Sequence, residues 1–135
     1  MDGLEKTATL PTESINLTFV TPLRILKDGL SVREMSFSAL AMNLLRRMSA
    51  MAFYYCSMEL DLDYKYLSRA STEIRMAEGD FRRVDWGRNL SGIIGRGRFV
   101  GNLVGFHPFL LFGENFHAGK GAAYGLGSYV MERTL

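Results

Sequence analysis

The residues best suited to chemistry lie near the end of the chain, in the stretch HAGKGAAYGLG at residues 117–127, named the glycine-rich segment. Four glycines and Lys120 fall within these eleven positions. Glycine lets the backbone turn in either hand and approach another molecule closely. Exposed backbone N–H groups beside a cation suit a phosphate, and a nucleic-acid backbone carries many phosphates. The segment is therefore predicted to bind an anion, with Lys120 as its cation.

The segment differs from the nucleotide-binding P-loop, whose pattern is G-x-x-x-x-G-K-[ST]. Five residues separate Gly113 from Gly119, and Gly121 stands where a Ser or Thr would bind magnesium. An apolar helical pattern precedes the segment, whereas a strand precedes a P-loop. We therefore exclude nucleotide hydrolysis.

The two histidines, His107 and His117, do not indicate a metal site. With Cys56 as the single cysteine and no H-x-x-x-H or C-x-x-C spacing, the ligands of a metal are missing, and no cofactor is predicted. His117 begins the glycine-rich segment and is the one catalytic candidate, as a phosphate donor or an acid or base. The alternative for His117 is a helix C-terminal residue that interacts with the helix dipole.

Basic and acidic residues are unevenly distributed along the chain. Residues 1–79 carry nine basic and ten acidic side chains, whereas residues 80–135 carry seven basic and four acidic ones. Arginine outnumbers lysine twelve to four, and its planar guanidinium group suits phosphate and base recognition. Charge alone favours a solvated arginine-rich surface, and the asymmetry adds an indication of an anionic partner.

The chain has 135 residues, 47% of them hydrophobic, which is the size and composition of one globular domain. No apolar run approaches the roughly 20 residues needed to cross a bilayer, and the polar N-terminus is unlike a secretory signal. A single cysteine excludes an internal disulfide and fits a reducing compartment. We expect a cytoplasmic protein without a membrane partner, in which residues 1–14 form a flexible lead-in or linker.

Hydrophobic periodicity divides the rest of the chain into strands and helices. Strands are expected at 15–20, 81–86, 93–100 and 124–131, and helices at 37–56, after Asp63, and at 106–116. The order β–α(α)–β–β–α–β predicts an α+β fold, a ferredoxin-like βαββαβ sandwich with helices on one face of an antiparallel sheet. The first and last strands would be central neighbours, with the hairpin strands outside.

Three local features sharpen this expectation. Thr21-Pro22 interrupts the first strand, which favours an edge position or a bulge. Ser36 is a good N-cap, and the helix that follows has apolar residues at helical spacing from Phe37 to Tyr55. Alternation places Arg96 and Arg98 on one face of their strand.

Several motifs together resemble one family, the C-terminal domain of the CRISPR repeat-processing endoribonucleases in the RAMP superfamily. The motifs are TPLR (21–24), SF with LLRR in the same helix (36–47), VDW (84–86), GIIG (92–95), GE with HAGKG (113–121) and YGLG (124–127). They occur in the family's order, and the resemblance runs from about Leu17 to Met131. The glycine-rich segment is its most specific part. We expect the domain to occupy residues 15–133.

The resemblance implies a metal-independent RNase that cuts CRISPR precursor RNA within its repeats, as part of antiviral defence. Family members carry two ferredoxin-like domains in tandem, and the N-terminal one usually holds the catalytic histidine. This chain would be the second domain, with repeat RNA and an N-terminal ferredoxin-like domain as its partners and a homodimer as an alternative assembly. It is expected to bind RNA and not to cleave it alone.

The resemblance also assigns residues to RNA contact. Gly119, Lys120, Gly121, Gly125 and Gly127 fall on the family's glycine-rich motif, and Arg24, Arg88, Arg96 and Arg98 are further RNA-binding candidates. Some of the glycines are expected only to allow a tight turn or close packing. Trp86 could stack on a base, or be a half-buried strand residue. The alternative function is a non-enzymatic ferredoxin-like assembly module of a ribonucleoprotein complex.

Overall fold

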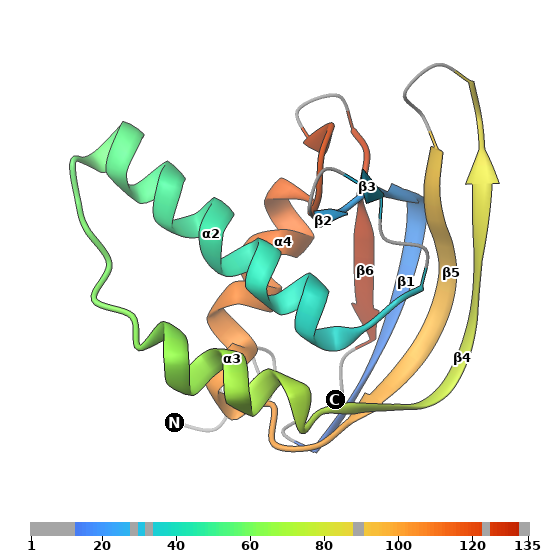
Figure 1. The fold of residues 1–135 in the computed structure, drawn as a ribbon, viewed down its shortest axis with the longest axis horizontal. Helices are drawn as coiled ribbons and strands as arrows, with labels where there is room; N and C mark the ends of the chain where they lie inside the picture. The colour runs from blue at the N-terminus through green and yellow to red at the C-terminus, as the bar shows by residue number, and fades with distance from the viewer. Residues whose placement is uncertain (1–12, 28–29, 32–33, 88–90, 123–124, 133–135) are drawn as a thin grey trace, which may run out of the picture.

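A computed structural model describes residues 13–27, 30–31, 34–87, 91–122 and 125–132 of the chain. The elements are β1 (Ser14–Leu23), β2 (Leu26–Lys27), β3 (Leu30–Ser31), α2 (Phe37–Cys56), α3 (Tyr64–Thr72), β4 (Arg75–Asp85), β5 (Ser91–Val100), a 3-10 turn (Val104–Phe106), α4 (His107–Phe116) and β6 (Tyr129–Glu132). Within the described residues, an antiparallel four-stranded sheet has the order β4-β5-β1-β6. The helices all cover one of its faces (Figure 1). The α+β, ferredoxin-like prediction is confirmed.

Strand β1 shows the predicted alternation and forms the middle of the sheet. Ile15, Leu17 and Phe19 are buried under the helices, while Asn16 and Thr18 are exposed on the open face. The pairing of β1 with β5 shifts its register between Phe19 and Leu23, where Thr21-Pro22 interrupts the strand. The predicted bulge is therefore confirmed, and the alternative of an edge position is wrong.

The arrangement of the strands corrects one expectation. The first and last strands are neighbours, since β1 pairs with β6 over Asn16–Phe19. However, β6 lies at one edge, and β5 is central because it pairs with both β1 and β4. Strand β4 begins at Arg75, six residues before the expected Phe81, because residues 75–80 pair with β5 but are mostly exposed. A strand without a buried face lacks the alternation on which the prediction depended.

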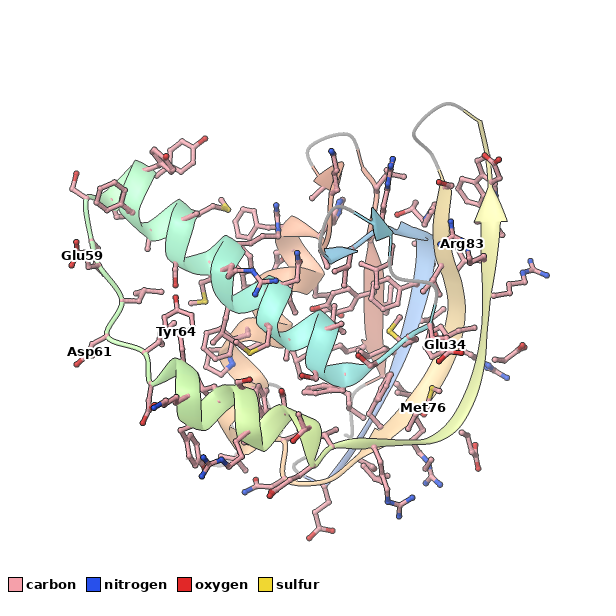
Figure 2. All side chains as sticks on the ribbon, viewed as in Figure 1. Glu34, Glu59, Asp61, Tyr64, Met76 and Arg83 are labelled. Atoms are coloured by element: carbon pink, nitrogen blue, oxygen red, sulfur yellow. The ribbon has the colours of Figure 1, made fainter. Side chains whose placement is uncertain are left out.

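The helices begin where their caps predict. The Ser36 side chain accepts a 3.1 Å hydrogen bond from the Ala39 N–H at the start of α2, and Asp63 accepts one of 3.0 Å from Tyr66 at the start of α3. The two helices also meet through side chains, since Tyr64 at the start of α3 points toward α2 (Figure 2) and its hydroxyl lies 2.7 Å from that of Ser49. These contacts fix α2 and α3 as neighbours.

The core lies between the sheet and the first half of α2. Phe37 packs against Phe99 of β5 and Phe106 before α4, with ring centroids 5.7 and 5.3 Å apart. The apolar stripe of α2 is buried only as far as Leu45. Tyr55, expected in the same stripe, is 81% exposed, because α2 extends past the elements that cover its beginning (Figure 1).

The expected lead-in at residues 1–14 falls mostly outside the described residues. Of the two that are described, Ser14 already belongs to β1, and the carbonyl of Glu13 accepts a 2.9 Å hydrogen bond from Gly101 N–H. The sheet therefore begins with Ser14.

Candidate functional site

The glycine-rich segment leaves the end of α4 and returns to β6, and its backbone is bonded to the strand beneath it. His117 has a positive φ of 68° and donates its N–H to Gly113 O at the helix end. Ala118 N–H donates to Gly127 O (3.0 Å), and Gly127 N–H donates to Pro22 O (2.9 Å). Thr21 adds two bonds, since its hydroxyl donates to Gly125 O and accepts from Ser128 N–H.

Helix α2 holds the first residues of the segment through two side chains that lie four positions apart. The Asn43 carboxamide oxygen accepts a 2.8 Å hydrogen bond from Gly119 N–H. Arg47 donates from Nε to His117 O (3.2 Å) and from Nη2 to Phe116 O (2.9 Å). Burial lowers the pKa of Arg47, yet the cation is well placed because the carbonyls at a helix C-terminus attract positive charge.

Lys120 is the exposed cation of the segment. The backbone N–H of Lys120 donates a 2.6 Å hydrogen bond to the carbonyl oxygen of Arg24, the residue that follows β1. The Lys120 side chain is exposed. Arg24 is partly buried, and its Nε has no hydrogen-bond partner among the described residues. One backbone hydrogen bond thus joins Lys120 to Arg24, and both residues were predicted to bind RNA.

All four glycines of the segment have positive φ angles, and they differ in how closely the chain packs around them. Gly119 and Gly127 are buried, and a Cβ on Gly119 would lie 2.5 Å from Arg24 O, while one on Gly127 would meet the Ala118 carbonyl. Gly121 and Gly125 are partly exposed, with positive φ angles of 87° and 91°. The turn of the chain therefore favours glycine at all four positions, and at Gly119 and Gly127 close packing against backbone carbonyls requires it as well.

The hydrogen bonds correct the expectation of free N–H groups. The N–H groups of Gly119, Lys120, Gly125 and Gly127 all donate to protein oxygens. An anion approaching these residues would therefore meet the Lys120 side chain and not a ring of backbone donors. The remaining residues of the segment, Ala123 and Tyr124, lie outside the described part of the chain.

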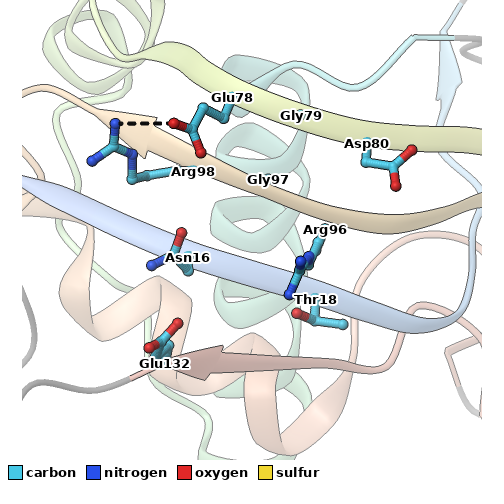
Figure 3. A pocket seen from close by; sticks show the side chains of 9 residues that line it. All are labelled: Asn16, Thr18, Glu78, Gly79, Asp80, Arg96, Gly97, Arg98 and Glu132. Atoms are coloured by element: carbon cyan, nitrogen blue, oxygen red, sulfur yellow. Dashed lines mark ion pairs between the residues drawn. The ribbon is translucent and has the colours of Figure 1, made fainter.

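Arg96 and Arg98 lie on the open face of the sheet, opposite the helices that hold the glycine-rich segment. They line a shallow pocket of about 300 Å³ together with Asn16, Thr18, Glu78, Gly79, Asp80, Gly97 and Glu132 (Figure 3). Arg98 Nη2 lies 3.7 Å from Glu78 Oε1, with both side chains partly in solvent. Three carboxylates lie beside the two arginines, so this face has mixed charge. Arg96 and Arg98 share one face of β5, as predicted, but they do not lie in one site with Lys120.

The remaining predicted residues lie elsewhere or outside the described residues. Trp86 follows β4 and is 51% exposed, while Arg88 falls in an undescribed range. His117 lies at the end of α4, as its dipole alternative predicts, and its Nδ1 is buried without a partner among the described residues. Asn43 and Arg47 were not predicted as site residues. The signal for Asn43 was an amide within the apolar run of residues 41–45.

Among the described residues, no cluster of three or more His, Cys, Asp or Glu side chains could hold a metal ion. None of the described helices is long and apolar enough to cross a membrane.

Comparisons with known proteins identify the family. Residues 17–129 match the family described as CRISPR-associated endoribonuclease Cas6. A sequence search among curated proteins finds no match. Similar solved structures include a Cas6 product complex, with 15% identity and a TM-score of 0.69 over 93% of this chain and 54% of that chain. Thermus thermophilus Cas6 matches with 17% identity and a TM-score of 0.70 over 95% of this chain and 57% of that chain. A partial Cas6-RT-Cas1–Cas2 complex is also similar, with 16% identity and a TM-score of 0.73 over 98% of this chain and 25% of that chain.

These structural likenesses establish the fold, and this chain spans little more than half of the first two relatives. The family match covers most of the chain and includes the start of β6. It also spans the α2 side chains and the glycine-rich segment described above. The chain belongs to the CRISPR-associated Cas6 endoribonuclease family.

Proposed function

We propose that this chain is the RNA-binding C-terminal domain of a Cas6 endoribonuclease that processes CRISPR precursor RNA. The observation that carries the proposal is the Lys120 side chain, exposed on a glycine-rich segment whose backbone is bonded to α2 and β1. An exposed cation on a backbone that is hydrogen-bonded to Arg24 suits the phosphate backbone of RNA. The partner is CRISPR repeat RNA, which fits the product complex formed by a structural relative.

The proposal assigns binding to this chain and leaves cleavage to a larger assembly. His117, the one catalytic candidate, sits at a helix end with Nδ1 buried, and Arg47 binds its carbonyl. An N-terminal ferredoxin-like domain would supply the catalytic histidine, in agreement with the relatives' greater length.

A second candidate function is a non-enzymatic assembly module, and the open sheet face favours it. Glu78, Asp80 and Glu132 lie among Arg96 and Arg98 there, and such mixed charge suits a protein surface better than a polyanion. The partner on this face would be the N-terminal ferredoxin-like domain or a second copy of the chain. This role is compatible with RNA binding at the glycine-rich segment.

Titration of labelled repeat RNA against the wild-type protein at several salt concentrations tests the proposal. We expect affinity that falls steeply as salt rises, because bound phosphates release counterions, and RNA that stays intact during incubation. A stable oligomer in light scattering without RNA affinity would favour the assembly module. Salt-independent binding would contradict the proposed contact with the RNA backbone.

A further inference from the structure

One row of side chains on α2 connects the glycine-rich segment to an open groove. Asn43, Arg47, Met51 and Tyr55 recur every four residues, so they share one face of the helix. Asn43 and Arg47 bind the backbone of residues 116–119. The row then continues beyond these contacts, and Met51 and Tyr55 line a groove of about 430 Å³.

The groove lies between the C-terminal ends of α2 and α4. Its lining residues are Arg47, Met51 and Tyr55 from α2, Asn115 and Phe116 from α4, and His117 and Ala122 from the glycine-rich segment. Tyr55 is 81% exposed and Phe116 is 50% exposed. Two large aromatic side chains are thus presented to solvent from the two helices that bound the groove.

The polar groups of the groove suit a nucleobase. None of its seven lining residues is acidic, and it contains an amide, an imidazole and a guanidinium group. Its volume falls within the range of about 300–1,000 Å³ that is common for small-ligand sites. Exposed aromatic rings are the usual platforms on which unpaired bases stack, whatever their sequence.

We propose that this groove binds an unpaired nucleobase of the RNA whose backbone meets Lys120. The inference rests on the proposed RNA binding and extends it from the phosphates to a base. His117 and Ala122 line the groove and lie on either side of Lys120 in the glycine-rich segment. The site for the base therefore adjoins the site for the phosphate. Tyr55 and Phe116 supply the stacking surfaces, and Lys120 holds the neighbouring phosphate.

Binding of a labelled single-stranded RNA, and of the same RNA annealed into a duplex, tests the groove. Tyr55→Ala should weaken single-strand binding about 5- to 150-fold, the loss typical of one base–aromatic stack. Duplex binding and the salt dependence should stay unchanged, because no phosphate contact is removed. Tyr55→Phe should bind like the wild type, since the ring remains.

Tyr54→Ala is the matched control, because Tyr54 is equally aromatic, 78% exposed and adjacent in sequence but does not line the groove. Circular dichroism should show that all three variants fold. If the wild type binds RNA and Tyr55→Ala binds as Tyr54→Ala does, the groove proposal is wrong and RNA binding stands. If the wild type binds no RNA, both proposals fail. A Tyr55→Ala variant that only dissociates an oligomer would show that the groove is a protein contact and overturn the inference.

Discussion

The Asn43 carboxamide oxygen on α2 accepts a 2.8 Å hydrogen bond from the backbone N–H of Gly119, 76 residues later in the chain. Gly119 is buried and Asn43 is half-buried, so removing the Asn43 side chain takes the acceptor away from a donor in a largely buried position. Asn43→Ala should lower the free energy of unfolding by about 1–3 kcal/mol, the usual penalty for an unsatisfied buried donor. Urea denaturation measures the loss.

Asn43→Asp is the control, because a carboxylate keeps the acceptor and should retain most of the stability. Equal losses for the alanine and aspartate variants would show that the hydrogen bond does not hold Gly119.

Arg47 should contribute to stability through its two bonds to the end of α4. Arg47→Ala removes a charged donor from the carbonyls of Phe116 and His117, which should cost about 1.5–3 kcal/mol in thermal or urea unfolding. Its neighbour Arg46 is exposed, and Arg46→Ala should change stability by less than about 0.5 kcal/mol. Similar losses at both positions would contradict the contact.

Glycines with and without close packing should respond differently to alanine. At Gly125, with φ 91° and no atom of the described residues within 4 Å of an added Cβ, alanine should cost about 1–2 kcal/mol of backbone strain. At Gly127, the added Cβ also meets the Ala118 carbonyl, so the loss should be clearly larger. Unfolding midpoints of the two variants give the comparison, and equal losses would show that Gly127 is not needed for close packing.

Tyr129 should make the protein sensitive to alkali. Its hydroxyl donates to Leu110 O at 2.6 Å, and burial, with a smaller effect from Glu114, raises its pKa far above 10. The folded protein therefore keeps this proton when the unfolded chain begins to lose it. Stability should fall above about pH 10 by about 1.4 kcal/mol per pH unit from this group.

Tyr129→Phe should remove that part of the pH dependence while keeping the ring that packs on Phe19, with centroids 5.0 Å apart. Urea denaturation between neutral and alkaline pH makes the comparison. A pH dependence identical to the wild type would exclude Tyr129 as its source.

Local signals in the sequence located the helices and the first strand of this fold, whereas the last strand begins at Tyr129 and not at the expected residue 124. Alternation identified β1, and Ser36 and Asp63 marked where α2 and α3 begin, because caps and periodicity act within a few residues. The place of β5 between β1 and β4 was missed, since strand order depends on contacts between distant segments. The first half of β4 was missed because its residues have no buried face.

The candidate site was predicted only in outline. The local composition singled out Lys120 and the glycines, and the family resemblance assigned them to RNA binding. The bonds from Asn43, Pro22 and Arg24 to the segment could not be predicted, because each joins residues more than 70 positions apart. These bonds use the N–H groups that the sequence suggested were free, and they leave the Lys120 side chain as the exposed contact.

The most direct measurement of the RNA-binding account is the salt dependence of repeat RNA binding by Lys120→Ala. Losing one phosphate contact should weaken binding at every salt concentration and reduce the slope of log affinity against log salt by about one. Lys65, exposed on α3 away from the segment, provides the control variant Lys65→Ala, which should keep the wild-type slope. A Lys120→Ala protein with the affinity and slope of the wild type would contradict the account.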